Sequence, residues 1–224
     1  VLRTRWMRDG RTVVFCHLAD VFDNDVGKGN PGGITGIDGE LIHASLQPVS
    51  VVSPGGALGA EAGTLFGDPV DRAAIFWRPK AKLPPLNPYL VVTDPDALVL
   101  ARYRDDPHQR ASVAMKRNDN WTSVVTGVHS LTPAMWRWLA TEAGAHLYLE
   151  DPSGDFDHPD VVEATEDFLM LVSGRDGRRV LRVPAPATKL REIGGEGEIV
   201  SPQEGAFAIE CQKGVPRMFE IVRQ

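Results

Sequence analysis

The chain has 224 residues, of which 42% are hydrophobic and 24% charged, and this composition is ordinary for a globular protein with a sizeable core. Its net charge of -6 and the lack of a basic face argue against nucleic-acid binding, and no apolar run approaches the roughly 20 residues that span a bilayer. The two cysteines, Cys16 and Cys211, are too few for a disulfide scaffold or a cysteine metal site, so we expect both to be small buried side chains.

The first part of the chain predicts a buried strand followed by a glycine-rich loop. Consecutive apolar residues at positions 12–17 favour a parallel strand that is covered on both faces. The loop at 20–39 contains six glycines and four acidic residues, and open α/β folds bind ligands at such loops. Because the glycines match neither a P-loop nor a dinucleotide motif, a plain connection is the alternative. Strands within 40–54 are expected near a sheet edge, since Pro48 argues against a central position.

The middle of the chain predicts a meander of short strands and then a helix. Apolar runs separated by turn residues place strands at 89–93, 98–103, 111–117 and 121–126. Thr132 has the character of an N-cap and Pro133 that of a first helical residue, and Gly144 ends the helix. The run A-H-L-Y-L at 145–149 is predicted to be a further strand. A strand, a helix and a strand in this order indicate an α/β unit.

The last part of the chain, from residue 167, predicts a small antiparallel β domain. The runs D-F-L-M-L-V-S and R-R-V-L-R-V are strands joined by the turn G-R-D-G, which we interpret as a hairpin. Four further runs, separated by turn residues, predict more strands and no helix. We therefore divide the chain into an α/β domain at 1–160 and a small β domain at 161–224.

One pair of residues is a candidate nucleophilic site. Cys16 ends the first predicted strand and His129 follows the last strand of the meander, and a thiolate needs such a base beside it. Class I glutamine amidotransferases use a cysteine and a histidine placed in this way. The flanks of Cys16 are Phe15 and His17, not the small residues that a strained nucleophile turn needs. An amidase or amidotransferase-like hydrolase that uses Cys16 and His129 is therefore an alternative to a non-catalytic chain.

The other polar and aromatic groups favour structure over chemistry. The acidic run at 150–160 lacks the spacing of a calcium loop and is interpreted as solvated, and the six histidines show no zinc spacing, so we expect neither a metal nor a cofactor. No two carboxylates are paired in the way that a glycosidase needs. Trp121 and Trp136 are candidates for stacking on sugar rings, although core packing is the default role of tryptophan. A carbohydrate-binding module is thus a second alternative.

Several stretches resemble a known family. They are D-G-R-T-V-V-F with the acidic loop and G-I-T-G-I, V-T-D-P-D-A-L-V-L-A-R-Y with V-A-M-K-R-N-D-N-W-T-S-V, and L-T-P-A-M-W-R-W-L-A-T-E-A-G-A-H-L-Y. These stretches are similar to the glutamine-amidotransferase-like trimerisation domain of bacterial β-galactosidase-type glycoside hydrolases. The tail, with M-F-E-I-V near its end, resembles the small C-terminal β domain of the same enzymes.

This resemblance implies a fold and a function. The fold would be α/β, with a flavodoxin-like or class I glutamine-amidotransferase-like sheet and its helices, followed by a small antiparallel β domain. In the family this domain is usually non-catalytic and supports subunit assembly, and the catalytic glutamates belong to a (β/α)8 barrel that we do not find in this chain. We therefore expect an accessory and oligomerisation region whose partners are its own upstream catalytic domain or identical subunits. The resemblance also implies that the domain's first strands are missing before Val1, and it leaves the compartment open.

Overall fold

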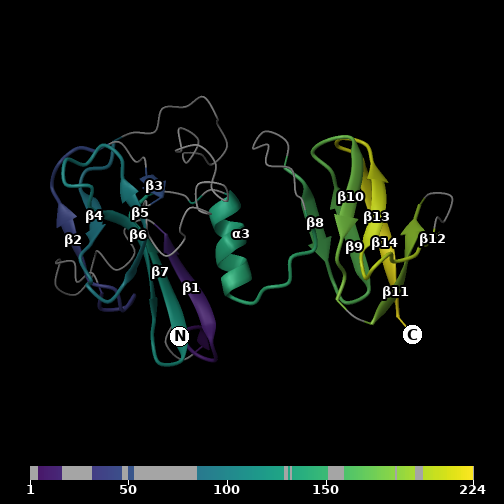
Figure 1. Ribbon diagram of the computed structural model, residues 1–224, viewed down its shortest axis with the longest axis horizontal. Helices are drawn as coiled ribbons and strands as arrows, with labels where there is room; N and C mark the ends of the chain where they lie inside the picture. The colour runs from purple at the N-terminus through teal and green to yellow at the C-terminus, as the bar shows by residue number, and fades with distance from the viewer. Residues whose placement is uncertain are drawn as a thin grey trace. The chain divides into compact units, whose positions relative to one another are not determined.

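The computed structural model of the chain describes residues 5–16, 32–46, 50–52, 85–128, 131, 133–150, 159–184, 186–194 and 199–223. Within these ranges the protein forms fourteen strands and one helix, α3 (Figure 1). The chain divides into two compact units, Val1–Leu139 (unit 1) and Ala140–Gln224 (unit 2). Each unit has its own hydrophobic core and is described by itself.

Unit 1 is built on one mixed sheet of seven strands. The main path through the sheet is β1-β7-β6-β4-β2, and β5 pairs with β6 and with β3. β1 and β7 lie side by side and are parallel, whereas the other pairings are antiparallel (Figure 1). The strands are β1 (Arg11–Cys16), β2 (Gly39–Ile42), β3 (Ser50–Val52), β4 (Tyr89–Val92), β5 (Leu98–Tyr103), β6 (Ala111–Arg117) and β7 (Trp121–Thr126).

The four predicted strands are confirmed, but only β5, β6 and β7 form a meander, because β4 pairs with β2 and β6 and not with β5. β5, β6 and β7 occupy the predicted ranges, and β4 ends at Val92, one residue early. These runs are short, apolar and bounded by turn residues, which is why local pattern was sufficient to find them. β2 and β3 lie at margins of the sheet, as expected, because each pairs with a single neighbour among the described strands.

The predicted flavodoxin-like or glutamine-amidotransferase-like α/β fold is wrong. The described residues are mostly strand, the pairings are mostly antiparallel, and α3 (Pro133–Glu142) stands alone as a helix. The predicted strand at 145–149 is also wrong, since only Leu149 makes an isolated bridge, to Leu181 of unit 2. Without a strand directly after α3, the described residues around this helix form no strand–helix–strand crossover, which is the unit from which such α/β folds are made. In the described part of the chain, no helix is long and apolar enough to cross a membrane.

β1 is a parallel strand, but the prediction that both of its faces are covered is wrong. It is parallel, as predicted, and β7 is its partner, but it has no second neighbour among the described strands. Only Phe15 of β1 is buried, and both Arg11 and Cys16 at its ends are exposed. A run of consecutive apolar residues therefore marks a strand at the sheet's edge here and not one that is covered on both faces. The expectation that Cys16 is buried is wrong for the same reason.

Both faces of the unit 1 sheet are nevertheless covered near its centre. Side chains alternate between the faces along each strand, so the two faces have separate clusters. One cluster includes Val91 and Val124 and packs against Met135 and Leu139 of α3. The other consists of Phe15, Ile37, Leu90 and Val125, with Trp121 packed against it. The N-cap prediction at Thr132 lies outside the described residues, whereas Gly144 takes a φ of 71°, as expected of the residue just past a helix.

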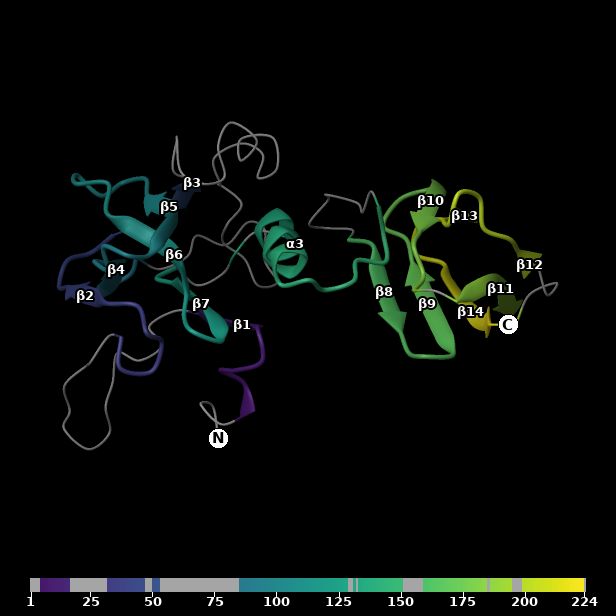
Figure 2. The same ribbon diagram turned by 60° about the horizontal axis from the view of Figure 1, so that its bottom comes forward.

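Unit 2 is an antiparallel sandwich. A five-stranded sheet has the order β12-β11-β14-β9-β8, and a two-stranded sheet pairs β10 with β13. Figure 2 shows β10 and β13 as a pair separate from β9, β14 and β11. The inner faces meet in one core that includes Leu169, Leu190 and Phe219 from the larger sheet and Leu181 and Phe207 from the smaller. The strands are β8 (Val161–Ala164), β9 (Phe168–Val172), β10 (Gly177–Leu181), β11 (Ala187–Ile193), β12 (Ile199–Val200), β13 (Phe207–Cys211) and β14 (Pro216–Arg223).

The hairpin predicted at G-R-D-G is wrong. The two flanking strands, β9 and β10, exist, but they pair with β14 and β13 respectively and not with each other. The turn at 173–176 therefore carries the chain from one sheet to the other. Asp160 stabilises this turn. One of its carboxylate oxygens accepts hydrogen bonds from Ser173 Oγ at 2.9 Å, Gly174 N at 2.7 Å and Arg179 Nε at 3.3 Å.

Candidate functional site

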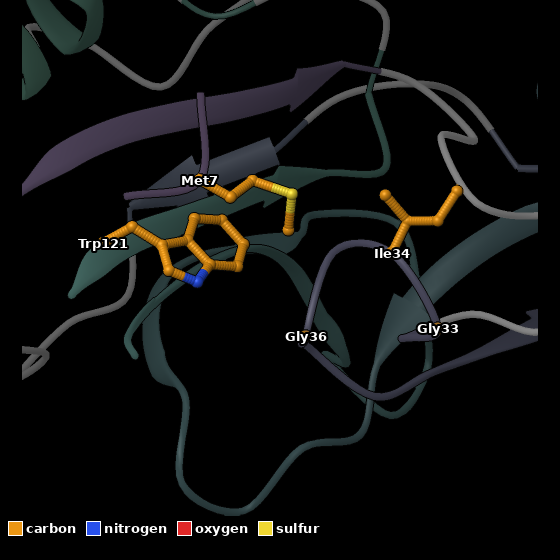
Figure 3. A pocket seen from close by; sticks show the side chains of 5 residues that line it. All are labelled: Met7, Gly33, Ile34, Gly36 and Trp121. Carbon is orange, nitrogen blue, oxygen red and sulfur yellow. The ribbon is translucent and has the colours of Figure 1, made fainter. Parts of the chain in front are cut away.

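One hollow among the described residues of unit 1 is a small pocket beside the β1–β7 pair. It has a volume of about 300 Å³ and is lined by Met7, Gly33, Ile34, Gly36 and Trp121. Met7 precedes β1, Trp121 is the first residue of β7, and the other three come from the loop that follows the undescribed segment 17–31. Figure 3 shows the Met7 side chain beside the Trp121 indole, with Ile34 across the hollow from them.

The Trp121 indole is held from several directions. Its residue pairs with Arg11 in the parallel register of β1 and β7, and its carbonyl oxygen accepts a hydrogen bond from Asn118 N at 2.8 Å. The Phe15 ring meets the indole edge-on, with ring centroids 6.4 Å apart and an interplanar angle of 74°. Such edge-to-face pairs contribute about 0.5–1.5 kcal/mol beyond their buried area. The indole is therefore a fixed wall of the pocket.

The opposite wall is a glycine-rich turn that passes close to the indole. Gly36 N donates a hydrogen bond to Gly32 O at 3.0 Å, and both glycines have positive φ values, of 72° and 106°. A side chain on Gly36 would lie 3.2 Å from Asn118 Oδ1 and 3.7 Å from the Trp121 ring. Glycine is thus needed at 36 both for the backbone conformation and for the close approach.

Asp94 fastens this turn to the sheet. Its carboxylate accepts hydrogen bonds from Asp38 N at 3.2 Å, Asp96 N at 2.9 Å and Lys116 Nζ at 2.7 Å. Burial raises the pKa of Asp94, but the hydrogen bonds from Lys116 and from the two backbone amides outweigh burial, and the pKa lies below its ordinary value. The carboxylate is therefore ionised at neutral pH and holds a wall of the pocket in place.

The described lining of the pocket is mostly apolar. Among the described residues that line it, none is an acid, a base or a nucleophile. It offers an aromatic face, a thioether, a branched aliphatic side chain and glycine backbone. One nitrogen donor nearby, the buried Nδ2 of Asn118, is unused within the described structure. An aromatic face with a nearby donor suits a flat or ring-shaped ligand that has one apolar side.

The other sequence candidates are not gathered at this pocket. Cys16 is exposed at the end of β1, and although the residue reaches solvent, burial around its sulfur raises the pKa of the thiol. A raised pKa disfavours the thiolate that a nucleophile needs. His129 lies outside the described residues, so its placement beside Cys16 stays a prediction. Trp136 is exposed on α3, which packs on the sheet face opposite to that of Trp121, so the two tryptophans do not share a site.

The prediction that the acidic run at 150–160 is solvated is wrong at its last residue. Asp160 is not solvated, because its side chain is fully buried against Arg179, whose side chain is 3% exposed. Residues 151–158 of the run lie outside the described ranges. Within those ranges, no three His, Cys, Asp or Glu side chains are close enough together to hold a metal ion.

The pocket residues other than Trp121 were missed from the sequence. Met7, Gly33, Ile34 and Gly36 come from two segments that are apart in the chain, and no local spacing connects them. The only available signal was the G-G-I-T-G stretch, whose glycines indicate a close backbone approach without saying to what.

Comparison with known proteins adds a likeness of fold. No protein-family profile matches the sequence, and no curated protein matches it. Three solved structures are similar in fold: Gan42B, a GH42 beta-galactosidase, with a TM-score of 0.53, 13% identity and 97% of this chain covered; the beta-galactosidase from Bacillus circulans sp. alkalophilus, with 0.53, 15% and 96%; and the cold-adapted beta-galactosidase from Rahnella sp. R3, with 0.55, 13% and 96%.

These likenesses define the class of fold. The chain spans 29–30% of the length of the three structures that it resembles. Nearly the whole chain, both units included, therefore has the fold of a part of GH42 beta-galactosidases. The resemblance of the sequence to β-galactosidase-type enzymes is supported at this level, and the amidotransferase-like and flavodoxin-like descriptions are not.

Proposed function

We propose that this chain is a non-catalytic accessory and assembly region of a carbohydrate-active glycoside hydrolase of β-galactosidase type. The observation that carries the proposal is the likeness of fold, which extends over 96–97% of this chain and over 29–30% of the three beta-galactosidases. A region that accounts for less than a third of such an enzyme leaves room for a separate catalytic domain. Likeness of fold alone is a weak guide to function, so the chemistry of the described residues has to agree with it.

The buried carboxylates agree with a non-catalytic role. Glycoside hydrolysis needs two carboxyl groups facing each other about 5–9.5 Å apart, one of them able to give a proton. Each buried carboxylate of the described structure is instead engaged by a cation: Asp94 by Lys116, Asp106 by Arg110 and Asp160 by Arg179. Cationic partners favour the ionised form. These carboxylates hold the fold together and are not available as general acids.

Hydrolase assays test this proposal directly. The purified 224-residue chain should not hydrolyse nitrophenyl galactosides, whereas the protein encoded by the chain together with its adjoining coding sequence should do so. Deleting this chain from that longer protein should lower the number of subunits in its oligomer. Galactosidase turnover by the chain alone would contradict the proposal. So would glutaminase or esterase turnover by the chain alone that Cys16→Ala abolishes, because that result would favour the Cys16–His129 alternative.

A second candidate function is carbohydrate binding at the Trp121 pocket. The observation in its favour is the partly buried aromatic wall beside the unused Nδ2 of Asn118, since the apolar face of a pyranose stacks on indole rings. Titration with galactose or lactose should change the tryptophan fluorescence, and Trp121→Ala should remove the change. Trp136→Ala is the matched control, because that residue is an exposed tryptophan outside the pocket. An equal response from the Trp121→Ala variant would exclude this pocket as the sugar site.

A further inference from the structure

The two-stranded sheet of unit 2 has a hollow on its solvent side. One face of this sheet packs into the core of the sandwich through Leu181, Phe207 and Ile209. Because side chains alternate along a strand, Val180 and Ala208 point to the other side. A hollow of about 350 Å³ lies there, and we call it the trough. All of its lining residues belong to unit 2, so it is separate from the pocket of unit 1.

The floor of the trough is made of short side chains. Val180 of β10 is directly opposite Ala208 of β13, and Ala206 comes just before β13 on the same side of the sheet. None of these three side chains extends far from the sheet, so the longer side chains around them stand as walls. Pockets for small molecules begin at about 300 Å³, and the trough therefore has room for a small ligand.

The walls of the trough have equal numbers of positive and negative side chains. Arg178 and Arg182 line it together with Glu150 and Glu204, and Gln203 adds an amide. Arg182 and Glu150 form an exposed ion pair. Within the described part of the chain, the guanidinium of Arg178 and the carboxylate of Glu204 make neither a hydrogen bond nor an ion pair. One donor group and one acceptor group are therefore open to a ligand.

Glu204 is held in a backbone conformation that glutamate rarely adopts. Gln203 and Ala206 exchange backbone hydrogen bonds of 2.7 and 2.9 Å across the two residues Glu204 and Gly205. Both of these residues have positive φ values, of 50° and 79°, as in a type I′ turn. Asparagine, aspartate and glycine are favoured in such turns, because they tolerate the left-handed region best. A longer side chain that is kept there at a cost in backbone energy indicates a role for that side chain.

The charge balance of the trough restricts the class of ligand. Glu150 and Glu204 would repel an anion, and Arg178 and Arg182 would repel a cation. An apolar ligand would leave these polar groups without hydrogen bonds. An extended peptide would pair with a sheet edge, whereas the trough lies over a face, and the segment at 148–150 already bonds to the edge of β10. Hydroxyl groups fit, because each one can donate to a carboxylate and accept from a guanidinium.

We propose that the trough binds a short, neutral β-galactoside through its hydroxyl groups. A guanidinium presents its N–H groups in one plane, so Arg178 can donate to two neighbouring hydroxyl oxygens, and Glu204 accepts a hydrogen bond from a further hydroxyl. That the sugar is a galactoside rests on the glycoside-hydrolase function proposed above. Because the described lining has no aromatic side chain, we expect a dissociation constant on the order of millimolar.

Titration of the whole 224-residue chain with lactose and with galactobiose, followed by amide NMR shifts, tests this proposal. The amide signals of Val180, Ala206 and Ala208 should move and saturate in the millimolar range. Tryptophan fluorescence should not report this binding, because all five tryptophans are in unit 1. The amide of Gly36 lies at the pocket of unit 1, so its signal distinguishes binding there from binding in the trough.

Two substitutions separate a binding role from a structural one. Arg178→Ala and Glu204→Asn should each weaken sugar binding about tenfold, because each removes a hydrogen bond from a charged group. Glu204→Asn should also raise the urea midpoint followed by circular dichroism, since asparagine suits this turn better than glutamate. Arg191→Ala is the matched control and should leave binding unchanged, because Arg191 is an exposed arginine that pairs with Glu220 outside the trough.

Lack of movement at Val180, Ala206 and Ala208 with both sugars, up to about ten times the expected constant, would overturn the proposal. Unchanged binding by Arg178→Ala or Glu204→Asn would also overturn it, and so would a Glu204→Asn variant that loses stability together with binding. These readouts use the chain alone and need no hydrolysis. The trough can therefore fail this test while the longer protein passes the hydrolase assays, and the reverse result would count against the proposed function alone.

Discussion

The two units cover their sheets differently. In unit 1, α3 packs on one face of the sheet, and the loop residue Ile37 with Phe15 covers part of the other. In unit 2, the two-stranded sheet covers the inner face of the five-stranded sheet, whose outer face keeps Phe168 and Met218 about half exposed. In both sheets the side chains alternate between the two faces, so alternation alone does not say which face is buried. What decides it is whether a second layer is present.

The polar anchors differ in what they join. In unit 1, Asp94 fastens a loop to the sheet, and Asp106 fastens the turn between β5 and β6 through Arg110. In unit 2, Asp160 fastens the turn that passes between the two sheets. All five tryptophans have numbers below 140, so tryptophan fluorescence reports unit 1 alone, whereas circular dichroism reports both units. The two units can therefore be perturbed and followed separately.

The largest expected effect is in unit 2. Asp160→Ala removes a fully buried carboxylate and leaves the Arg179 guanidinium buried without it. Loss of one partner of a buried ion pair destabilises by about 3–5 kcal/mol. We expect urea unfolding followed by circular dichroism to show an early loss of strand signal while the tryptophan signal of unit 1 keeps its midpoint. Glu150→Ala is the control, because its ion pair with Arg182 is exposed and should cost about 1 kcal/mol or less. A loss of both signals together would show that the units do not unfold separately.

The next effect is in unit 1, at Gly127. A Cβ atom there would lie 2.2 Å from Tyr103 Oη and 2.5 Å from Leu90 O, the two atoms that share a hydrogen bond of 2.7 Å. Gly127→Ala should therefore break a buried hydrogen bond and overfill the core, at a cost of about 3 kcal/mol. Tryptophan fluorescence during urea unfolding measures it. Gly10→Ala, also in unit 1, where a Cβ meets nothing within 4 Å but φ is positive, should cost only about 1 kcal/mol. Equal costs at the two positions would contradict the packing described for Gly127.

The smallest effect depends on pH and again concerns unit 1. Hydrogen bonds from Arg110 hold the pKa of Asp106 well below its ordinary value. The stabilisation from Asp106 is therefore complete above the unfolded pKa of about 4 and is lost as pH falls below it. Asp106→Asn should reduce the free energy of unfolding by about 2 kcal/mol at neutral pH, and the difference from wild type should shrink toward about pH 2.

Fluorescence-monitored urea unfolding at several pH values follows that difference. Asp105→Asn is the control, since Asp105 is exposed and pairs only with its neighbour Arg104 in the described structure. A difference between wild type and Asp106→Asn that stays constant down to about pH 2 would contradict the role given to Asp106.

The sequence predicted strands well and their arrangement poorly. β5, β6 and β7 follow from short apolar runs between turn residues, which is information carried by neighbouring positions. The course of the chain after Val172 could not be found in this way, because β9 pairs with β14 and β10 with β13, strands that lie more than twenty residues further along the chain. β8 was missed because V-V-E-A is short and does not alternate cleanly.

The candidate site could likewise be predicted only where it depends on a single residue and not where it depends on how segments are arranged. Trp121 was singled out because tryptophan is rare and large, but its neighbours at the pocket come from before β1 and from the glycine turn. The parallel pairing of Arg11 with Trp121 brings the segment before β1 to the pocket, and Asp94 holds the glycine turn there. The exposure of Cys16 also depends on tertiary structure, since a cysteine at an edge strand has the same local sequence as one at a central strand.

The position of β14 has a consequence for biosynthesis. Pro216–Arg223 lies between β9 and β11, so the strand made last of the described fourteen is inside its sheet and not at the margin. Until those residues have left the ribosome exit tunnel, β9 and β11 have no strand between them. Their inward-facing leucines therefore remain exposed to solvent. Unit 2 must therefore fold after translation of its last strand, whereas the meander of unit 1 can pair while synthesis continues.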